Sequence, residues 1–297
     1  MPPTDVSVRH FTWNDVAALG GLQGNSHPDA AAAVERWLRQ PNLLPERDCL
    51  IASIDGVLVG YAYVVVEQAL SRGVLLWDVG QRSGASAAEK PLLDAAIEHA
   101  RGLGLSVLQE DIPEANTARK ALLVASGMVH VRTHRHLRRD ATSKTAIALP
   151  PGTSLRMASQ TDVAAVTTLQ NAAFEGSWGF SPNTPAEITY RVFTLPVVPP
   201  DGVVLLEADG RLVGYCWTER EEGGSPGIIS MVGVPPDKQG KGFGLAITAA
   251  GIDHLVEVGA TPIEITVDAE NAPAIRVYEG LGFQDRWRSL WYEMALR

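Results

Sequence analysis

The sequence of 297 residues contains only two cysteines, Cys49 and Cys216. Two cysteines are too few for a disulfide framework or a cysteine-based zinc site, so we expect a protein of a reducing cytoplasm. No segment approaches the roughly 18 consecutive apolar residues that a membrane-spanning helix needs. The N-terminus has neither the basic region nor the apolar run of a secretory signal, which also favours a cytoplasmic location.

Basic residues are outnumbered as well, with 25 Lys and Arg against 34 Asp and Glu and a net charge of −9. This balance argues against a nucleic-acid partner, and nothing in the sequence suggests a membrane partner. Residues 1–147 carry 16 acidic and 15 basic side chains, so nearly all of the excess lies in the second half. An acidic half could attract a cationic small molecule such as an amine, although ordinary solubility charge explains the same pattern.

What the chain does have is apolar material for about two packed domains, with 45% hydrophobic residues. It also repeats itself. Three pairs of segments resemble each other in order: 9–19 with 156–166, 55–61 with 209–215, and 116–127 with 271–282. The offsets are 147, 154 and 155 residues. Chance similarity would not keep register over a hundred residues, so we interpret the chain as a duplicated domain.

The boundary between the copies is expected at 140–153, where small, polar and proline residues are typical of a linker. We therefore predict domains at 1–145 and 150–297. The basic tract at 132–139 just before the linker is either an anion site or a terminal strand. Its alternating apolar and polar residues favour the strand.

Each half is predicted to be a mixed α/β domain. A short strand opens it, followed by a helix that Asp15 or Asp162 helps to begin. A hairpin follows, with an Asp-Gly turn at 209–210 in the second half, which is a strong local signal. The remaining elements are expected as helices at 29–40, 244–258 and 272–279, hairpin strands at 203–208 and 212–218, and strands at 227–234, 263–267 and 288–294.

The most informative segment joins a strand to a helix at 231–246 and reads MVGVPPDKQGKGFGLA. Glycines at such a junction let backbone N–H groups converge on an anion at the helix N-terminus. The spacing is neither that of a P-loop nor that of the dinucleotide fingerprint. The segment is therefore either a different phosphate cradle or a plain tight turn.

Two motifs carry a family resemblance. Val234-Pro235 followed by Gln239, Gly242 and Gly244 resembles the acetyl-CoA signature of the GCN5-related N-acetyltransferases, the GNAT family. The second signature of that family resembles the pattern formed by Asn271, Ala274, Tyr278, Gly282 and Phe283. The resemblance implies an α/β fold of two tandem GNAT-like domains, each a mixed, mostly antiparallel twisted sheet flanked by helices.

The resemblance also implies acetyl-CoA as co-substrate, no metal, and direct attack of a primary amine on the thioester without an acyl-enzyme. The pantetheine arm would pair with the strand at 232–234, and the loop amides would hold the pyrophosphate. The residues expected to contact acetyl-CoA are Val232, Gly233, Val234, Gln239, Gly240, Lys241, Gly242, Phe243, Gly244, Asn271, Ala274 and Tyr278.

Tyr278 is the expected general acid. Asn271 is a good helix N-cap, and Tyr278 lies about two turns later on the same side of the helix. The family resemblance places the thioester sulfur on that side, where a phenol can protonate the departing thiolate. The alternative is a tyrosine that only packs on the sheet.

The general base is where the sequence departs from the family. Many members carry a glutamate on the strand before the glycine loop, whereas 228–231 reads IISM here. Candidates are Glu219, Glu221 and Glu222 at the end of the preceding hairpin and Glu264 on the following strand. A water relay is equally possible, and the acidic cluster is also typical of a solvated turn.

Two other features have competing interpretations. Trp178 and Phe180 lie among glycines in a segment that shapes the acceptor pocket in the family, and they either line that pocket or pin a loop. Cys216 could be mistaken for a nucleophile. It lacks a supporting histidine in the sequence pattern, which favours a buried small hydrophobe.

The first half has lost the motif residues. At an offset of 155, Gln239 corresponds to Gly84, Gly244 to Glu89 and Tyr278 to Leu123. We therefore expect a degenerate first domain and one working site in 150–297 that acetylates a small-molecule amine. Alternatives are a protein or peptide N-acetyltransferase, or a non-catalytic acyl-CoA-binding protein. The chain is expected to be a monomer or homodimer.

Overall fold

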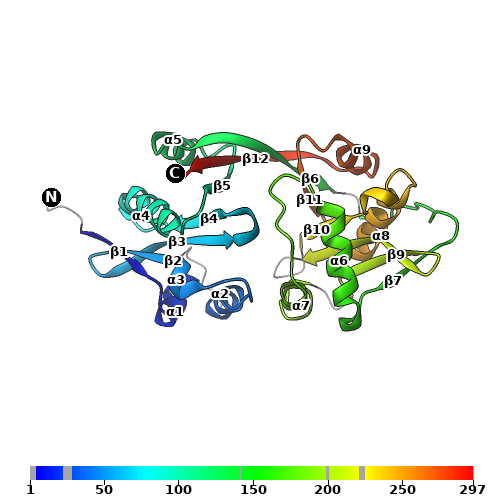
Figure 1. Ribbon diagram of the computed structural model, residues 1–297, viewed down its shortest axis with the longest axis horizontal. Helices are drawn as coiled ribbons and strands as arrows, with labels where there is room; N and C mark the ends of the chain where they lie inside the picture. Colours follow the sequence, from blue (N-terminus) through cyan, green and yellow to red (C-terminus); the bar gives the residue numbers. More distant parts are fainter. Residues whose placement is uncertain (1–4, 23–28, 141, 199–200, 221–224, 297) are drawn as a thin grey trace. The chain divides into compact units, whose positions relative to one another are not determined.

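The computed structural model describes residues 5–22, 29–140, 142–198, 201–220 and 225–296. The chain folds into two compact units (Figure 1). The first comprises residues 1–132 and 290–297, and the second comprises 133–289. These units do not coincide with the halves at 1–145 and 150–297, because their borders lie inside strands.

The first unit contains strands β1 (Val6–His10), β2 (Cys49–Ile54), β3 (Val57–Glu67), β4 (Arg72–Val79) and β5 (Val107–Pro113), in that order across its sheet, with the end of β12 (Gln284–Ala295) beside β5. Its helices are α1 (Val16–Gly20), α2 (Ala30–Leu38), α3 (Pro45–Asp48), α4 (Glu89–Gly102) and α5 (Thr117–Ala125), with 3-10 turns η1 (Trp13–Asp15), η2 (Gln68–Leu70) and η3 (Ala85–Ala88).

The second unit repeats the plan. Its strands are β7 (Thr153–Met157), β8 (Val203–Ala208), β9 (Arg211–Arg220), β10 (Gly227–Gly233), β11 (Ile263–Asp268), most of β6 (Val129–Arg139) and the start of β12. They lie in the order β7-β8-β9-β10-β11-β6-β12. Its helices are α6 (Val163–Phe174), α7 (Pro185–Phe193), α8 (Phe243–Glu257) and α9 (Ala272–Gly280), with 3-10 turns η4 (Gln160–Asp162) and η5 (Pro236–Lys238).

The two copies exchange their last strands. Strand β6 ends the first half of the sequence, yet its residues from Thr133 onward belong to the second unit and pair antiparallel with β11. Strand β12 ends the second half, yet Leu290, Tyr292 and Met294 belong to the hydrophobic core of the first unit. Each unit is therefore completed by a strand from the other half of the sequence.

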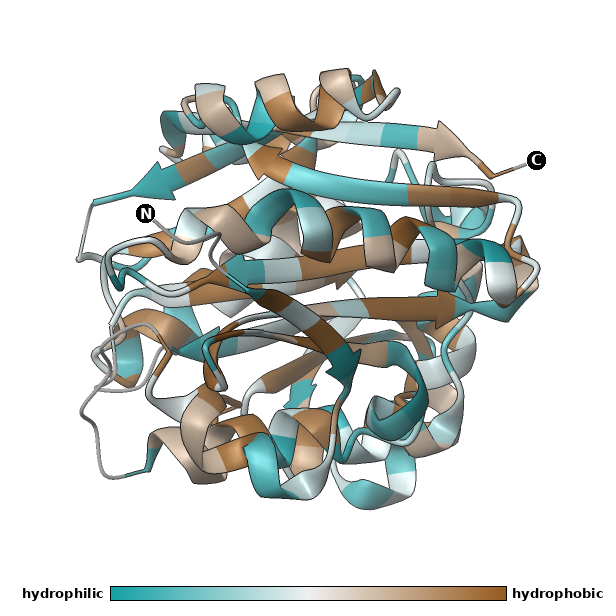
Figure 2. Ribbon diagram, turned by 90° about the vertical axis from the view of Figure 1, so that its left-hand side faces the viewer, coloured by the Kyte–Doolittle hydropathy of each residue, from teal (hydrophilic) through white to brown (hydrophobic). Residues whose placement is uncertain are grey.

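Helices pack on both faces of each sheet. In the second unit, α8 and α9 pack on one face, and the cluster formed there includes Cys216. Helices α6 and α7 pack on the other face, against Tyr215 and Trp217. This alternation along β9 is the period-two pattern of a strand buried on both sides. In Figure 2 the strands show long hydrophobic stretches, and hydrophilic and hydrophobic residues alternate on the helices.

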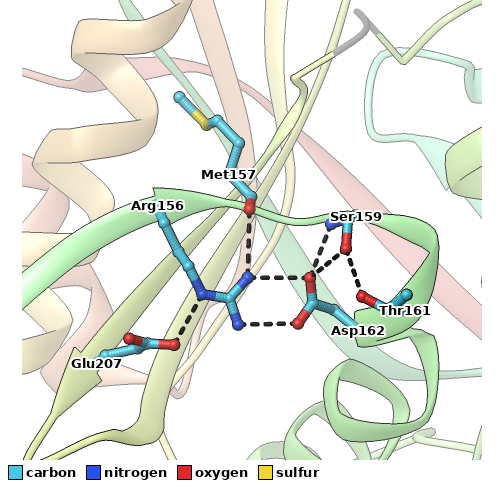
Figure 3. A network of polar contacts seen from close by, with 6 residues as sticks. All are labelled: Arg156, Met157, Ser159, Thr161, Asp162 and Glu207. Atoms are coloured by element: carbon cyan, nitrogen blue, oxygen red, sulfur yellow. Dashed lines mark hydrogen bonds and ion pairs between the residues drawn. The ribbon is translucent and has the colours of Figure 1, made fainter.

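Turn and cap chemistry explains why the elements begin and end where they do. The hairpin turn between β8 and β9 has positive φ at Asp209 (51°) and Gly210 (70°), as a type I′ turn requires. At the start of α6, Arg156 pairs with Asp162 at 2.8 Å and with Glu207 at 2.7 Å (Figure 3). The same ion pair recurs in the first unit between Arg9 and Asp15, at 2.6 Å.

The expected α/β class, with two tandem units of mixed sheet and helices, is confirmed. Among the described residues, no helix is long and apolar enough to span a bilayer.

Candidate active site

The glycine loop of the second unit connects β10 to α8 through η5. Gly240 and Gly242 have positive φ values of 76° and 80°, and Gly242 directly precedes α8. The side-chain amide of Gln239 donates to the carbonyl oxygen of Val234 at 3.1 Å, which ties the loop to the end of the strand. The loop therefore presents its backbone at the N-terminus of a 15-residue helix, where anions are stabilised.

The space around this loop is open. Apart from the adjoining chain, a Cβ built on Gly240 or Gly244 would meet no atom of the described residues within 4 Å, and one on Gly242 would meet only Pro150 Cγ at 3.8 Å. Gly244 lies inside the helix without a positive φ, so neither packing nor backbone conformation requires glycine there. Room beside the first turn of α8 suits a phosphate that approaches the backbone closely, which fits the pyrophosphate of acetyl-CoA.

Strands β10 and β11 separate beside the loop. Their parallel pairing covers three residue pairs, from Gly227 to Ile229 on β10, although β10 continues to Gly233. A bulge at Ser230 coincides with the separation, because the pairing of β10 with β9 shifts register between Ile229 and Met231. Bulges bend the strand that carries them. Beyond Ile229 and Ile265 the two strands are no longer paired, and we call this place the opening between β10 and β11.

Tyr278 lies on α9, in the buried cluster that also contains Val234 and Val267. The side chain of Asn271 caps α9 by accepting from the N–H of Ala274 at 3.1 Å. Tyr278 is buried in the cluster under α8, with its ring 6.1 Å from that of Phe283. Burial raises the pKa of Tyr278, so its phenol stays protonated at neutral pH. Its role as general acid remains a prediction.

The candidate carboxylates surround the position where the sequence lacks a glutamate. Ile228 on β10 pairs with Glu219 on β9 and with Glu264 on β11, so the two carboxylates flank it in one row. Glu264 lies 3.8 Å from Arg138 and 3.9 Å from Arg286. Glu221 and Glu222 lie outside the described residues.

The aromatic residues between α6 and α7 lie on the same side of the sheet as these helices. Trp178 makes an edge contact with the ring of His134 on β6, with centroids 6.1 Å apart. Phe180 stacks on Phe174 at the end of α6, at 5.6 Å. The structure thus brings Trp178 to the sheet and uses Phe180 to hold the loop. Whether either residue touches an acceptor stays a prediction.

Cys216 is fully buried, and its sulfur packs where a side chain on Gly251 of α8 would stand. Burial raises the pKa of its thiol to about 12. A buried thiol that stays protonated is a poor nucleophile, which agrees with the small-hydrophobe interpretation.

The basic tract at 132–139 is a strand, as its alternation predicts. Arg135 pairs with Asp285 at 2.6 Å, and Arg138 pairs with Asp140 at 2.6 Å. Two histidines of this strand, His134 and His136, reach the face that also carries Trp178. Sequence reasoning missed them because it assigned this segment to the first domain. The signal available was the alternation of the tract itself.

The corresponding loop of the first unit has a different shape. Where the second unit has its glycines, residues Ala85–Ala88 form the turn η3, with Ala85 and Ala88 buried. Glu89 begins α4 and lines a pocket of about 380 Å³. Leu123, at the position of Tyr278, is fully buried in the core.

Comparisons with known proteins agree with this geometry. The profile described as "Acetyltransferase (GNAT) family" matches residues 163–283. A mycothiol acetyltransferase of Thermomonospora curvata is 32% identical over 79% of this chain and 78% of its own length. One from Sanguibacter keddieii is 35% identical over 94% of this chain and 93% of its own.

This chain belongs to the GNAT family of acetyltransferases. Among solved structures, a tandem GNAT protein from the clavulanic acid biosynthesis pathway shares the fold with a TM-score of 0.73 at 17% identity, and the match covers 99% of each chain. The family resemblance seen in the motifs is therefore confirmed. The duplicated layout of the sequence also resembles that of mycothiol synthase, a tandem member of the family, and the matches to mycothiol acetyltransferases confirm this resemblance.

Proposed function

We propose that the second unit binds one acetyl-CoA per chain and transfers its acetyl group to a primary amine of a small molecule. The observation that carries this proposal is the opening between β10 and β11 beside a glycine loop with free space at a helix N-terminus. The loop from Gln239 to Gly244 would hold the pyrophosphate through its amides. The backbone from Val232 to Val234, at and just beyond the end of β10, would bind the pantetheine arm on the side that is not paired with β11.

The reaction needs two proton transfers and little else. The amine nitrogen bonds to the thioester carbonyl carbon, the carbon–sulfur bond breaks, and CoA leaves with the electron pair. Tyr278 would give its proton to that thiolate while the nitrogen loses one to a base. Holding both reactants in line contributes most of the acceleration, since no acyl-enzyme is needed.

The acceptor is proposed from the relatives. Because proteins named mycothiol acetyltransferase match over most of this chain, we propose deacetylated mycothiol as the first acceptor to test. The absence of a glutamate at Ile228 leaves open other small amines. The acidic character of the second half suits a cationic acceptor before it loses its proton.

Two measurements test the proposal together. Calorimetry should give one acetyl-CoA site per chain, and thiol release from acetyl-CoA should depend on deacetylated mycothiol or another member of a primary-amine panel. Tight acetyl-CoA binding with no transfer to any amine would favour a non-catalytic acyl-CoA-binding protein. Transfer to peptides but not to small amines would favour a protein acetyltransferase.

A further inference from the structure

The opening between β10 and β11 has a polar edge on the side of α6 and α7. Ile263, Ile265 and Val267 of β11 are buried in the cluster under α8, so the alternating residues face the other way. Thr266 is one of these, and it directly follows Ile265, the last residue of β11 paired with β10. Its exposed hydroxyl therefore stands where the strands part.

A histidine backs this hydroxyl. His136 of β6 is the cross-strand partner of Thr266, and its Nδ1 lies 3.0 Å from Thr266 Oγ1. Its Nε2 lies 3.0 Å from Oγ of the buried Ser289 on β12. The three side chains form a continuous hydrogen-bonded row from the opening into the sheet. If Thr266 donates to Nδ1, then Nε2 carries the ring proton and donates to Ser289.

The surroundings keep this imidazole neutral. The indole of Trp287 stacks on His136 with ring centroids 3.4 Å apart and planes 9° apart. Burial, with a smaller contribution from His134, lowers the pKa of His136 to about 4. Other charged groups on this face include Glu219, Asp268, and Glu264 with Arg138 and Arg286. At neutral pH one ring nitrogen can therefore accept a proton.

We propose that Thr266 and His136 form the relay that takes the proton from the attacking amine, an inference that rests on the proposed function. As nitrogen bonds to the acetyl carbon, it loses a proton to Thr266 Oγ1. The hydroxyl proton of Thr266 passes to His136 Nδ1, and the imidazolium later returns it to solvent. Tyr278 supplies the separate proton that CoA takes as it leaves.

This relay addresses the missing glutamate. A nitrogen that has attacked a carbonyl is far more acidic than a free ammonium, so a weak base suffices at that stage. Glu264 is held by two arginines, whereas Thr266 stands at the opening itself. His136 comes from the last strand of the first half, so the exchange of strands would deliver a group that the second half lacks.

The test uses full-length variants with deacetylated mycothiol as acceptor and single-turnover acetyl transfer as readout. Thr266→Val should lower the transfer rate about 10²-fold or more, the usual contribution of general base catalysis, while calorimetry shows unchanged acetyl-CoA affinity. Thr266→Ser keeps the hydroxyl and should stay within about fivefold of wild type. Thr168→Val removes an exposed hydroxyl on α6 and serves as the matched control.

His136→Gln keeps hydrogen-bonding groups but accepts no proton, and it should match Thr266→Val. Because the two act as one unit, the double variant should be no slower than either single one. If the rate losses of the two single variants multiplied in the double variant, they would indicate packing defects and overturn the relay. A Thr266→Val rate within threefold of wild type, or a larger loss in Glu219→Gln, would also overturn it.

Failure of the proposed function would look different. Wild-type protein would then bind no acetyl-CoA, or would bind it and acetylate no amine of the panel. Either result would overturn the relay together with the proposed function. Efficient transfer by both wild type and Thr266→Val would overturn the relay alone and leave the function standing.

Discussion

The parallel strands β4 and β5 of the first unit separate after three residue pairs, as β10 and β11 of the second unit do. Different side chains stand where the pairing ends. In the first unit Arg119 of α5 reaches between the strands, with its guanidinium 3.3 Å from the ring centre of Trp77 on β4 and 3.4 Å from Glu110 on β5. At an offset of 155 the same positions hold Val232, Ile265 and Ala274.

This cluster accounts for more of the difference between the two units than the lost motif residues do. Residues 85–89 lack the three glycines of the proposed phosphate cradle. In addition, Trp77, Glu110 and Arg119 form a buried charged cluster where the strands separate, and Arg119 also lines the pocket beside Glu89. Burial raises the pKa of Glu110 to about 7 against the opposing effect of Arg119. The same arrangement of strands therefore carries the proposed cofactor site in the second unit and a buried, charged cluster in the first.

The largest expected effect is on acetyl-CoA binding. Gly242→Leu should abolish binding in calorimetry, because a side chain blocks close approach to the loop and strains a residue at φ 80°. The matched control is Gly84→Leu in the first unit, where φ is 85°. It carries the same backbone strain and should leave one site per chain with unchanged affinity. Two equal acetyl-CoA sites per wild-type chain would contradict the proposed difference between the two units.

The next effect is on turnover. Tyr278→Phe should lower kcat by about 10²–10⁴-fold, because it removes the proton that the thiolate needs, while acetyl-CoA affinity changes little. Since burial raises the pKa of Tyr278, loss of activity on the alkaline side should not come from this phenol near pH 8.

Tyr63 provides the matched control for Tyr278. It is also buried, and burial also raises the pKa of its phenol, but it lies in the first unit. Tyr63→Phe should keep kcat unchanged. A Tyr278→Phe kcat within about threefold of wild type, with chemistry rate-limiting, would leave Tyr278 a packing residue.

The charged core of the first unit predicts a pH dependence of stability. The folded pKa of Glu110, about 7, exceeds its ordinary value of 4.5, so its contribution to stability is greatest below pH 4.5 and falls as pH rises to 7. Urea unfolding at pH 5 and pH 8 should show that wild type loses about 2 kcal/mol relative to Glu110→Gln over this interval. Equal pH profiles for the two proteins would contradict a raised pKa.

Many elements of this fold could be predicted from short segments of the sequence. The strand 203–208, the Asp209-Gly210 turn and the cap at Asn271 were predictable because each depends on neighbouring residues. The glycine loop was predictable for the same reason. Its two positive φ values are a property of the loop and of the helix that follows it.

Features that depend on distant pairing were not predictable in the same way. The exchange of β6 and β12 leaves no local mark, because either strand would suit either sheet. The bulge at Ser230 did leave a mark in the sequence. The offset between the repeats changes from 154 residues at the hairpins to 155 residues at Asn271, because β10 holds one extra residue that shifts its register with β9. The cluster at Arg119 needed the fold, since its three residues come from three elements.

The smallest expected effects concern a feature that the two units share. Asp162 completes a capping box with Ser159 at η4, just before α6, and pairs with Arg156. Asp15 does the same with Thr12 at η1 and pairs with Arg9. The side-chain bond from Arg9 is the main cause that lowers the pKa of Asp15 to about 2, and the pair at Arg156 lowers the pKa of Asp162 in the same way. A lowered folded pKa adds stability above the unfolded value of 3.8, and this stability is lost as pH falls toward 2.

Because both arginines are partly exposed, solvent screens the pairs, so Asp15→Asn and Asp162→Asn should each cost only about 1 kcal/mol in urea unfolding at pH 7. The costs should be similar at pH 7 and should shrink as pH falls toward 2, whereas the effects at Gly242 and Tyr278 belong to one unit alone. A cost confined to Asp162 would mean that this cap contributes to the active unit and not to the shared scaffold.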